Sequence, residues 1–259
     1  MARADKYTAF FKTIPSLTDE DRRAMAKLYL AHYDGSNETL FFSDLKDKTE
    51  VLLVRCGAVL VGFTTLQVYE LEWERRSVCV VYSGDTVVDR AHWGQQALAF
   101  TWIARMGEVK RETPDAPVYW FLIVKGHRTY RYLPTFAKSF YPHWSIDRSD
   151  LKPLADALAR KKFGEDYNAT TGVVEFAKSK GHLKDDIALP TAKERTKEAV
   201  KFFLARNPDY LRGHELVCLC ELAEENMKPL TKRIFLGKAR YGERLATPEA
   251  SRGWAAPPS

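Results

Sequence analysis

The spacing of hydrophobic and polar residues predicts a chain that mixes helices with strands. Over Asp19–His32, apolar side chains recur at helical spacing, so this segment is expected to form an amphipathic helix. From residue 50 the pattern changes to two runs rich in β-forming residues, 50–55 and 58–71, separated by a short turn. This arrangement predicts a β-hairpin. The intervening segment 38–46 fits either a helix or a loop.

A second block predicts two parallel strands joined by a helix. Residues 77–88 are rich in β-branched and aromatic side chains, and Gly84 is a candidate β-bulge that would kink this strand. Apolar residues then repeat at helical spacing from Ala97 to about Gly107, where the helix is expected to end. The nearly continuous apolar run Val118–Val124 is typical of a central strand covered on both faces. Together they predict a strand, helix, strand unit in which the helix joins two parallel strands.

The remaining pattern adds further helices and strands. Pro134 is expected to begin or kink a helix that continues through Tyr141. In chain order, the other expected elements are a helix over 151–162, a strand over 172–176, a helix over 196–205, a strand over 215–222 and a final helix over 225–241. The predicted fold class is therefore α/β (α+β), with a mixed central sheet that contains a kinked strand and is flanked by helices.

Composition adds limits on the class of protein. The chain has 259 residues, of which 45% are hydrophobic and 12% aromatic, which suffices for a packed core. No apolar run approaches the roughly 20 residues that a membrane span needs, and residues 1–6 lead into no hydrophobic signal segment. We therefore expect a cytoplasmic protein without a transmembrane segment.

The cysteines and histidines do not suggest a metal site. Cys218 and Cys220 would lie on one face of a strand, and all four cysteines are expected to be reduced core residues. The six histidines are scattered, without the close pairing of a zinc site, so no metal is expected. The net charge of +6 favours an acidic partner, and acyl carrier protein, an anionic cofactor, nucleic acid and anionic lipid all fit that description.

The most informative segment is the connection between the kinked strand and the helix that follows it. Here Val87-Val88 leads through a polar turn into Trp93-Gly94-Gln95-Gln96-Ala97-Leu98. The first backbone N–H groups of a helix lack partners within the helix, and the helix dipole favours an anion beside them. A phosphate-bearing acyl donor could therefore be held at this turn.

With this turn, the order helix, hairpin, kinked strand, turn, helix, buried strand, helix, strand resembles the GNAT acyltransferase superfamily over roughly residues 20–222. Members carry a turn of the type Arg/Gln-x-x-Gly-x-Gly/Ala whose amides hold the pyrophosphate of coenzyme A. The resemblance implies that the donor contacts Val87, Val88, Trp93, Gly94, Gln95, Gln96 and Ala97. It also implies an acyltransferase domain over 1–222, a C-terminal helix over 223–246 packed on it, and a flexible tail over 247–259.

The turn departs from the family pattern at two positions. Gln96 and Leu98 stand where the family often has glycine, so close approach of a pyrophosphate to the backbone is disfavoured. Either coenzyme A binds through contacts that differ from those of the family, or the donor arrives on acyl carrier protein, whose phosphopantetheine lacks the nucleotide. The second alternative resembles the acyl-homoserine lactone and N-acyl amino acid synthases, and the basic chain would suit an acidic carrier protein.

The resemblance also assigns catalytic candidates. Attack of an amine on a thioester requires a neutral nucleophile, a polarised carbonyl and a proton for the thiolate. The strand amides at Val87 and Val88 would hold the carbonyl. Candidates for proton transfer are Asp85 or Glu70 as the base, Tyr130 or Tyr141 as the acid, and His127, whose ordinary pKa suits neutral pH.

A basic, aromatic segment follows the buried strand. Lys125, Arg128 and Arg131 form a candidate docking patch for the carboxylates or phosphate of a carrier protein. The predicted function is transfer of an acyl group from acyl-CoA or acyl carrier protein to a small-molecule amine. The alternatives are a non-catalytic ligand-binding or nucleic-acid-binding module of the same fold, for which only charge argues, and acyl transfer at a membrane surface.

Overall fold

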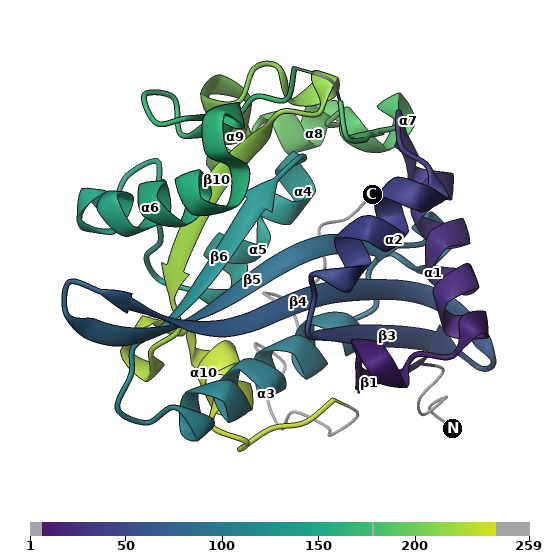
Figure 1. The fold of residues 1–259 in the computed structure, drawn as a ribbon, viewed down its shortest axis with the longest axis horizontal. Coiled ribbons are helices and arrows are strands. Elements are labelled where there is room, and N and C mark those ends of the chain that lie inside the picture. The colour runs from purple at the N-terminus through teal and green to yellow at the C-terminus, as the bar shows by residue number, and fades with distance from the viewer. Residues whose placement is uncertain (1–6, 178, 242–259) are drawn as a thin grey trace.

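The computed structural model describes residues 7–177 and 179–241, and it contains one large mixed sheet flanked by helices (Figure 1). This confirms the predicted fold class. The eight strands lie in the order β1-β3-β4-β5-β6-β10-β8-β7. The predicted tail 247–259 and the end of the segment 223–246 lie outside the described residues.

The strands of this sheet are β1 (Tyr7–Thr13), β3 (Glu50–Cys56), β4 (Val59–Trp73), β5 (Arg76–Val88), β6 (Val118–Val124), β10 (Glu215–Glu221), β8 (Val173–Val174) and β7 (Tyr167–Asn168). Two further strands, β2 (Tyr33–Asp34) and β9 (His182–Leu183), pair separately. The predicted hairpin is β3 and β4, which pair antiparallel. Among the described strands, β5 and β6 form the parallel pair, so the predicted strand, helix, strand unit is confirmed.

The helices are α1 (Asp19–His32), α2 (Glu38–Lys46), α3 (Ala97–Glu112), α4 (His127–Tyr130), α5 (Tyr132–Phe136), α6 (Lys152–Phe163), α7 (Asp185–Ala188), α8 (Ala192–Arg195), α9 (Glu198–Arg206) and α10 (Pro229–Phe235). Residues 38–46 are helical because the Asn37 side chain accepts a hydrogen bond from the Leu40 amide and caps the first turn. Thr18 and Asp21 form a capping box at the start of α1.

The predicted end of α3 near Gly107 is wrong, because this glycine serves packing and not helix termination. The helix continues to Glu112. A Cβ atom on Gly107 would lie 1.8 Å from the carbonyl oxygen of Phe235, the last residue of α10. Gly107 therefore permits the backbones of α3 and α10 to approach closely.

Three other expectations need correction. The helix that contains Pro134 ends at Phe136, because the chain turns extended and Tyr141 pairs with Leu219 of β10. The final helix covers 229–235 instead of 225–241, since it starts at a proline and Gly237 follows it with a positive φ of 71°. The strand predicted over 172–176 is limited to the short β8 at the edge region of the sheet.

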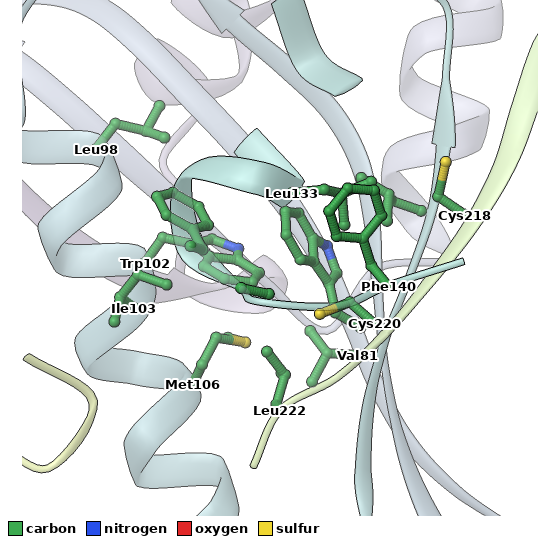
Figure 2. Packing of buried hydrophobic residues seen from close by; sticks show 14 of the residues in the cluster. Val81, Leu98, Trp102, Ile103, Met106, Leu133, Phe140, Cys218, Cys220 and Leu222 are labelled. Atoms are coloured by element: carbon green, nitrogen blue, oxygen red, sulfur yellow. The ribbon is translucent and has the colours of Figure 1, made fainter. Parts of the chain in front are cut away.

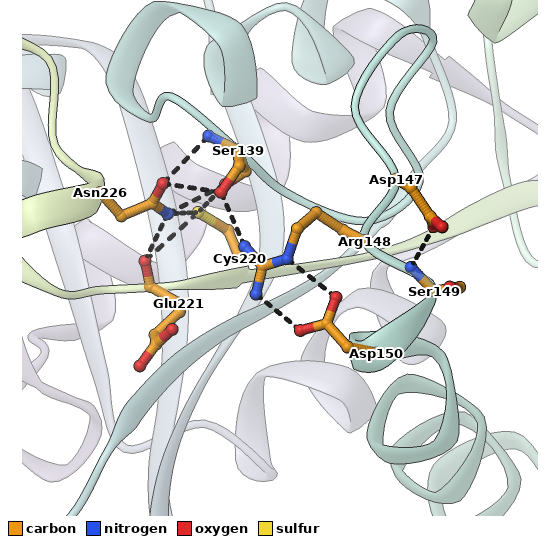
Figure 3. Close-up of polar contacts among 8 residues, drawn as sticks. All are labelled: Ser139, Asp147, Arg148, Ser149, Asp150, Cys220, Glu221 and Asn226. Carbon is orange, nitrogen blue, oxygen red and sulfur yellow. Dashed lines mark hydrogen bonds and ion pairs between the residues drawn. The ribbon is translucent and has the colours of Figure 1, made fainter.

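The loop after α5 is held against the end of β10 by a polar network (Figure 3). The Asn226 side chain accepts hydrogen bonds from the amide and hydroxyl of Ser139 and donates to the carbonyl of Glu221. Arg148 donates to the Ser139 hydroxyl and to both carboxylate oxygens of Asp150. These bonds fix the chain between α5 and the short 3-10 helix Ser149–Leu151 that precedes α6.

The core lies on both faces of the sheet. On one face, α3 packs Leu98, Trp102, Ile103 and Met106 against the strands (Figure 2). Cys218 and Cys220 of β10 point into the same cluster, and all four cysteines are free thiols. Cys79, Cys218 and Cys220 are buried core residues, as expected, whereas Cys56 is only partly buried. On the other face, α1 and α2 cover β3–β5 through one cluster, and α6 covers β5, β6 and β10 through another. The candidate site lies in the space between these two clusters.

Candidate active site

A β-bulge in β5 determines which side chains face the space between α2 and α6. Thr64 of β4 pairs with Thr86, whereas Leu66 pairs with Ser83, so β5 contains one extra residue between these pairs. The extra residue reverses the alternation of the strand. Tyr82 before the bulge and Val87 after it consequently pack on the same face of the sheet. The predicted bulge at Gly84 is confirmed.

Beyond this bulge the sheet opens. The parallel ladder between β5 and β6 ends at the pair Ser83 and Leu122, although β5 stays paired with β4 as far as Val88. The backbone edge of residues 84–88 that would otherwise pair with β6 therefore borders open space. This space is part of a cleft of about 370 Å³. A cleft filled by side chains would have favoured a non-catalytic module of the same fold, whereas the cleft beside β5 is open.

Asp85 lies in the wall of this cleft, on the bulge itself. Burial is the largest influence on this carboxyl group and raises its pKa from 3.8 to about 7, and the negative charge of Asp44 acts in the same direction. The positive charges of Lys125 and Lys48 oppose the rise, and Glu215 supports it. A carboxyl group with a pKa near neutrality can accept and return a proton under physiological conditions.

Two charged residues lie across the cleft from the bulge, where β6 and β10 meet. Lys125 follows the last residue of β6, and its ammonium group lies 3.3 Å from the carboxylate of Glu215, the first residue of β10. The pair is in register, because Leu216 opposes Val124. Burial and Lys125 act in opposite directions on Glu215, and burial prevails, so the pKa of Glu215 is raised.

The turn at the other end of the cleft is organised by its own side chains. The indole N–H of Trp93 donates to the Val88 carbonyl over 2.9 Å, which folds the turn back on the strand end. The Gln95 side chain accepts a hydrogen bond from the Leu98 amide over 3.1 Å and thereby caps the second residue of α3. Gly94 has a positive φ of 86° and open space around it. The turn thus offers a ligand an open backbone at Gly94, while the Leu98 amide is engaged.

The predicted donor-binding residues fall into two groups. Five of them, Val87, Val88, Trp93, Gly94 and Gln95, line the cleft. Gln96 precedes the first residue of α3, and that first residue, Ala97, is fully buried in the core.

The basic segment after β6 faces carboxylates. His127, Arg128 and Arg131 surround the buried carboxylate of Glu194, at 3.3, 3.2 and 3.6 Å respectively. Burial is the main reason that the pKa of His127 falls to about 4, and Arg128 lowers it further. His127 is therefore neutral at physiological pH. The guanidinium of Arg128 also lies 4.9 Å from the ring centroid of Trp93, which ties this cluster to the turn.

Three predicted catalytic residues lie away from the cleft. Glu70 is exposed on the distant part of the β4–β5 hairpin, where it accepts a hydrogen bond from Ser77. Tyr130 is fully buried and donates its hydroxyl hydrogen bond to the carbonyl of Pro142. Tyr141 packs in the core cluster beneath α6. The structure therefore brings Asp85, Lys125 and His127 together and leaves these three apart.

The cleft also contains residues that the sequence analysis did not single out. Tyr29 and Tyr33 stack at 4.4 Å between ring centroids on its α1 side, and burial raises the pKa of Tyr29 to about 12. Tyr132, two residues beyond the predicted Tyr130, lines the wall, and its hydroxyl has no hydrogen-bond partner among the described residues. Lys162 contributes from α6. A search for tyrosines near the end of β6 would have included Tyr132, whereas nothing in the sequence links Lys162 to β5.

Within residues 7–177 and 179–241, no group of three or more histidine, cysteine, aspartate or glutamate side chains is placed to hold a metal ion. In the same part of the chain, no helix has both the length and the apolar character needed to cross a bilayer.

Comparisons with known proteins found no matching family model and no matching curated protein. Solved structures with a partly similar arrangement include a probable N-acyltransferase of unknown function from Enterococcus faecalis, with 10% identity and a TM-score of 0.39 over 60% of this chain and 43% of that protein. Another is ribosomal-protein-alanine N-acetyltransferase from Brucella melitensis, with 16% identity and a TM-score of 0.40 over 54% and 96% of the two chains. A third is ElaA from Escherichia coli, with 15% identity and a TM-score of 0.34 over 55% and 94%. The similarity spans less than half of the Enterococcus protein, and all three TM-scores are below 0.5.

Proposed function

We propose that this chain is an N-acyltransferase that moves an acyl group from a phosphopantetheine thioester to an amine in the cleft beside β5. The observation that supports this function best is Asp85 on the β5 bulge. Its pKa of about 7 suits a general base, and it borders the open strand edge where β5 and β6 separate. A base and a row of strand backbone groups at one place are what aminolysis of a thioester requires.

In the proposed reaction the acceptor nitrogen attacks the thioester carbonyl, a C–N bond forms and the C–S bond breaks. Asp85 in its ionised form takes one proton from the nitrogen. The carbonyl oxygen would be held by backbone N–H groups on the open edge of residues 84–88. The departing thiolate needs a proton, for which we propose Tyr132. Burial raises the pKa of this phenol, so it is protonated at neutral pH.

For the donor we propose that the pantetheine arm enters along Val87 and Val88, with the phosphate end toward Gly94. The Gln95 side chain already occupies the Leu98 amide, so the turn offers a pyrophosphate fewer free donors. This supports acyl carrier protein over coenzyme A as the donor. Such a preference would place the chain beside the acyl-homoserine lactone and N-acyl amino acid synthases.

Release of free thiol tests the function directly. Acyl-CoA, acyl-pantetheine and acyl carrier protein that carry the same acyl group would be incubated with a panel of primary amines, with product mass as confirmation. We expect the rate to rise with pH through about 7, as Asp85 ionises. Asp85→Asn should lower kcat by roughly 10²–10⁴-fold, the range for loss of a general base. Tyr132→Phe should lower kcat with little change in KM.

A matched control is Glu72→Gln, which neutralises an exposed carboxylate on the same β4–β5 hairpin. It should react like the wild-type protein. Absence of thiol release with every donor, or an Asp85→Asn variant as active as the control, would contradict the proposal. A higher kcat/KM with acyl-CoA than with the carrier protein would overturn the donor assignment alone.

A further inference from the structure

The far part of the cleft, beneath α6, contains a cation without a carboxylate partner. Four lysine and arginine side chains of the described residues line the cleft: Lys125, Arg128, Lys162 and Lys180. Carboxylates lie within 4 Å of three of them, at 3.3 Å for Lys125, 3.2 Å for Arg128 and 3.6 Å for Lys180. Lys162 is the exception within the part of the chain that the structure describes.

Lys162 is held at the cleft wall by an aromatic ring. Its ammonium group lies 4.3 Å from the ring centroid of Tyr82, which is buried in β5. Lys48, whose side chain is fully buried, lies 5.5 Å from the same centroid and is paired with Asp44. Burial and the charge of Lys48 both lower the pKa of Lys162, and the charges of Asp44 and Asp47 oppose this effect. A partly buried cation in this position would be stabilised by an anion from a ligand.

Lys162 of α6 contacts β5 at Tyr82, and this contact determines how far the ammonium group lies from the proposed base, Asp85. Tyr82 precedes Asp85 by three residues, and a strand advances about 3.3 Å per residue, so the two side chains are separated by on the order of 7–10 Å, allowing for the bulge. The α-amine and the carboxylate of an amino acid cannot reach both, because these two groups are attached to one carbon. A longer, flexible molecule can span the interval.

We infer that the acceptor carries an anionic group, a carboxylate or a phosphate, that binds Lys162 while its amine faces Asp85 several bonds away. This inference rests on the proposed function for the role of the amine, although binding itself requires no acyl donor. The anion would bind the Lys162 ammonium group on the side that faces away from the Tyr82 ring, in the part of the cleft beneath α6. Donor and acceptor would thus occupy different ends of one cleft.

Isothermal titration calorimetry without any thioester tests the inference independently of turnover. The probes are 6-aminohexanoate, 6-aminohexyl phosphate, hexylamine and glycine, each added to the full chain. We expect one or both anionic probes to bind roughly 10- to 100-fold more tightly than hexylamine, the range for one charge-assisted hydrogen bond. The stronger of the two anionic probes identifies the carboxylate or the phosphate as the preferred group. Glycine should bind weakly, because it cannot span the two sites.

Variants at adjacent positions of α6 provide the control. Lys162→Met should abolish the preference for the anionic probes and leave hexylamine binding unchanged. Lys161→Met removes the same charge from an exposed neighbour and should preserve the preference. Equal affinities of hexylamine and the anionic probes for the wild-type protein, no measurable binding of either anionic probe, or a preference that survives Lys162→Met would overturn the inference. If the preference is found and no thioester reacts, only the proposed function fails.

Discussion

Replacement of Asp85 by asparagine is expected to stabilise the protein at alkaline pH while it lowers the proposed activity. The carboxyl group of Asp85 has a pKa of 3.8 in an unfolded chain and about 7 in the folded one. Between these two values the folded state keeps a proton that the unfolded state has released. The free energy of unfolding therefore falls as pH rises through this interval. The asparagine side chain carries no charge at any of these pH values, so the free energy of unfolding of the variant does not fall for this reason.

The magnitude follows from the two pKa values of Asp85. Each pH unit between them costs the folded state about 1.4 kcal/mol. By pH 8 the wild-type protein should have lost at most about 4 kcal/mol relative to pH 4 because of this group. Partial access of solvent from the cleft reduces the value, so a difference of about 2–4 kcal/mol between variant and wild type is expected. A stability cost at the proposed base would match the compromise between stability and activity that is common in enzymes.

Urea unfolding followed by tryptophan fluorescence measures this difference. The free energy of unfolding would be determined for wild type and Asp85→Asn at intervals from pH 4 to pH 8. Other titrating groups are shared by the two proteins and largely cancel in the difference. We expect the curves to diverge as pH rises, whereas Glu72→Gln should run parallel to wild type. A constant difference between Asp85→Asn and wild type across the whole range would refute the reasoning, since it would mean that Asp85 ionises at its ordinary pKa.

Three further substitutions test the packing around the site, each by urea unfolding. Gly107→Ala should cost about 3 kcal/mol or more, because its new methyl group would meet the Phe235 carbonyl oxygen at 1.8 Å; a change below about 1 kcal/mol would contradict this close approach. Gly84→Ala should cost about 1–3 kcal/mol and abolish thiol release, since its Cβ would lie 2.5 Å from Cε of buried Lys48; full activity would show that the bulge tolerates a side chain. Glu194→Gln should cost about 3–5 kcal/mol at neutral pH, because it leaves the partly buried guanidinium groups of Arg128 and Arg131 without their charged partner. This loss should shrink on acidification, as the pKa of Glu194 is lowered in the folded state, and a loss independent of pH would argue against the ion cluster.

The local features of the site were predictable because they depend on neighbours in the sequence. A glycine inside a β-rich run is a recognisable bulge signal, and it identified Gly84 and the adjacent Asp85. The change from strand to helix identified the turn at Gly94 in the same way. The neighbours in the sequence do not determine which tyrosine faces the cleft. Tyr130 and Tyr141 both follow β6 in the sequence, but Tyr130 bonds to Pro142 and both are packed away from the cleft, while Tyr132 faces it.

The basic segment after β6 shows that neighbours in the sequence do not reveal which charged side chains form ion pairs. Lys125, Arg128 and Arg131 read as an accessible patch in the sequence, because no acidic residue lies close to them along the chain. Their partners come from distant segments, Glu215 from β10 and Glu194 from α8. Ion pairs depend on the distance between two side chains in the folded protein, and the order of residues along the chain does not give this distance.

By itself the sequence determined the fold class, the hairpin, the parallel strands joined by α3, the bulge and the turn, because backbone propensity and hydrophobic periodicity act over a few residues. Tertiary structure decided the contents of the cleft. Packing of α1 and α2 against one part of the sheet and α6 against another brings Tyr33, Asp85 and Lys162 to a single space. Burial in that space gives Asp85 its raised pKa, since the cost of removing a charge from water depends on every surrounding group.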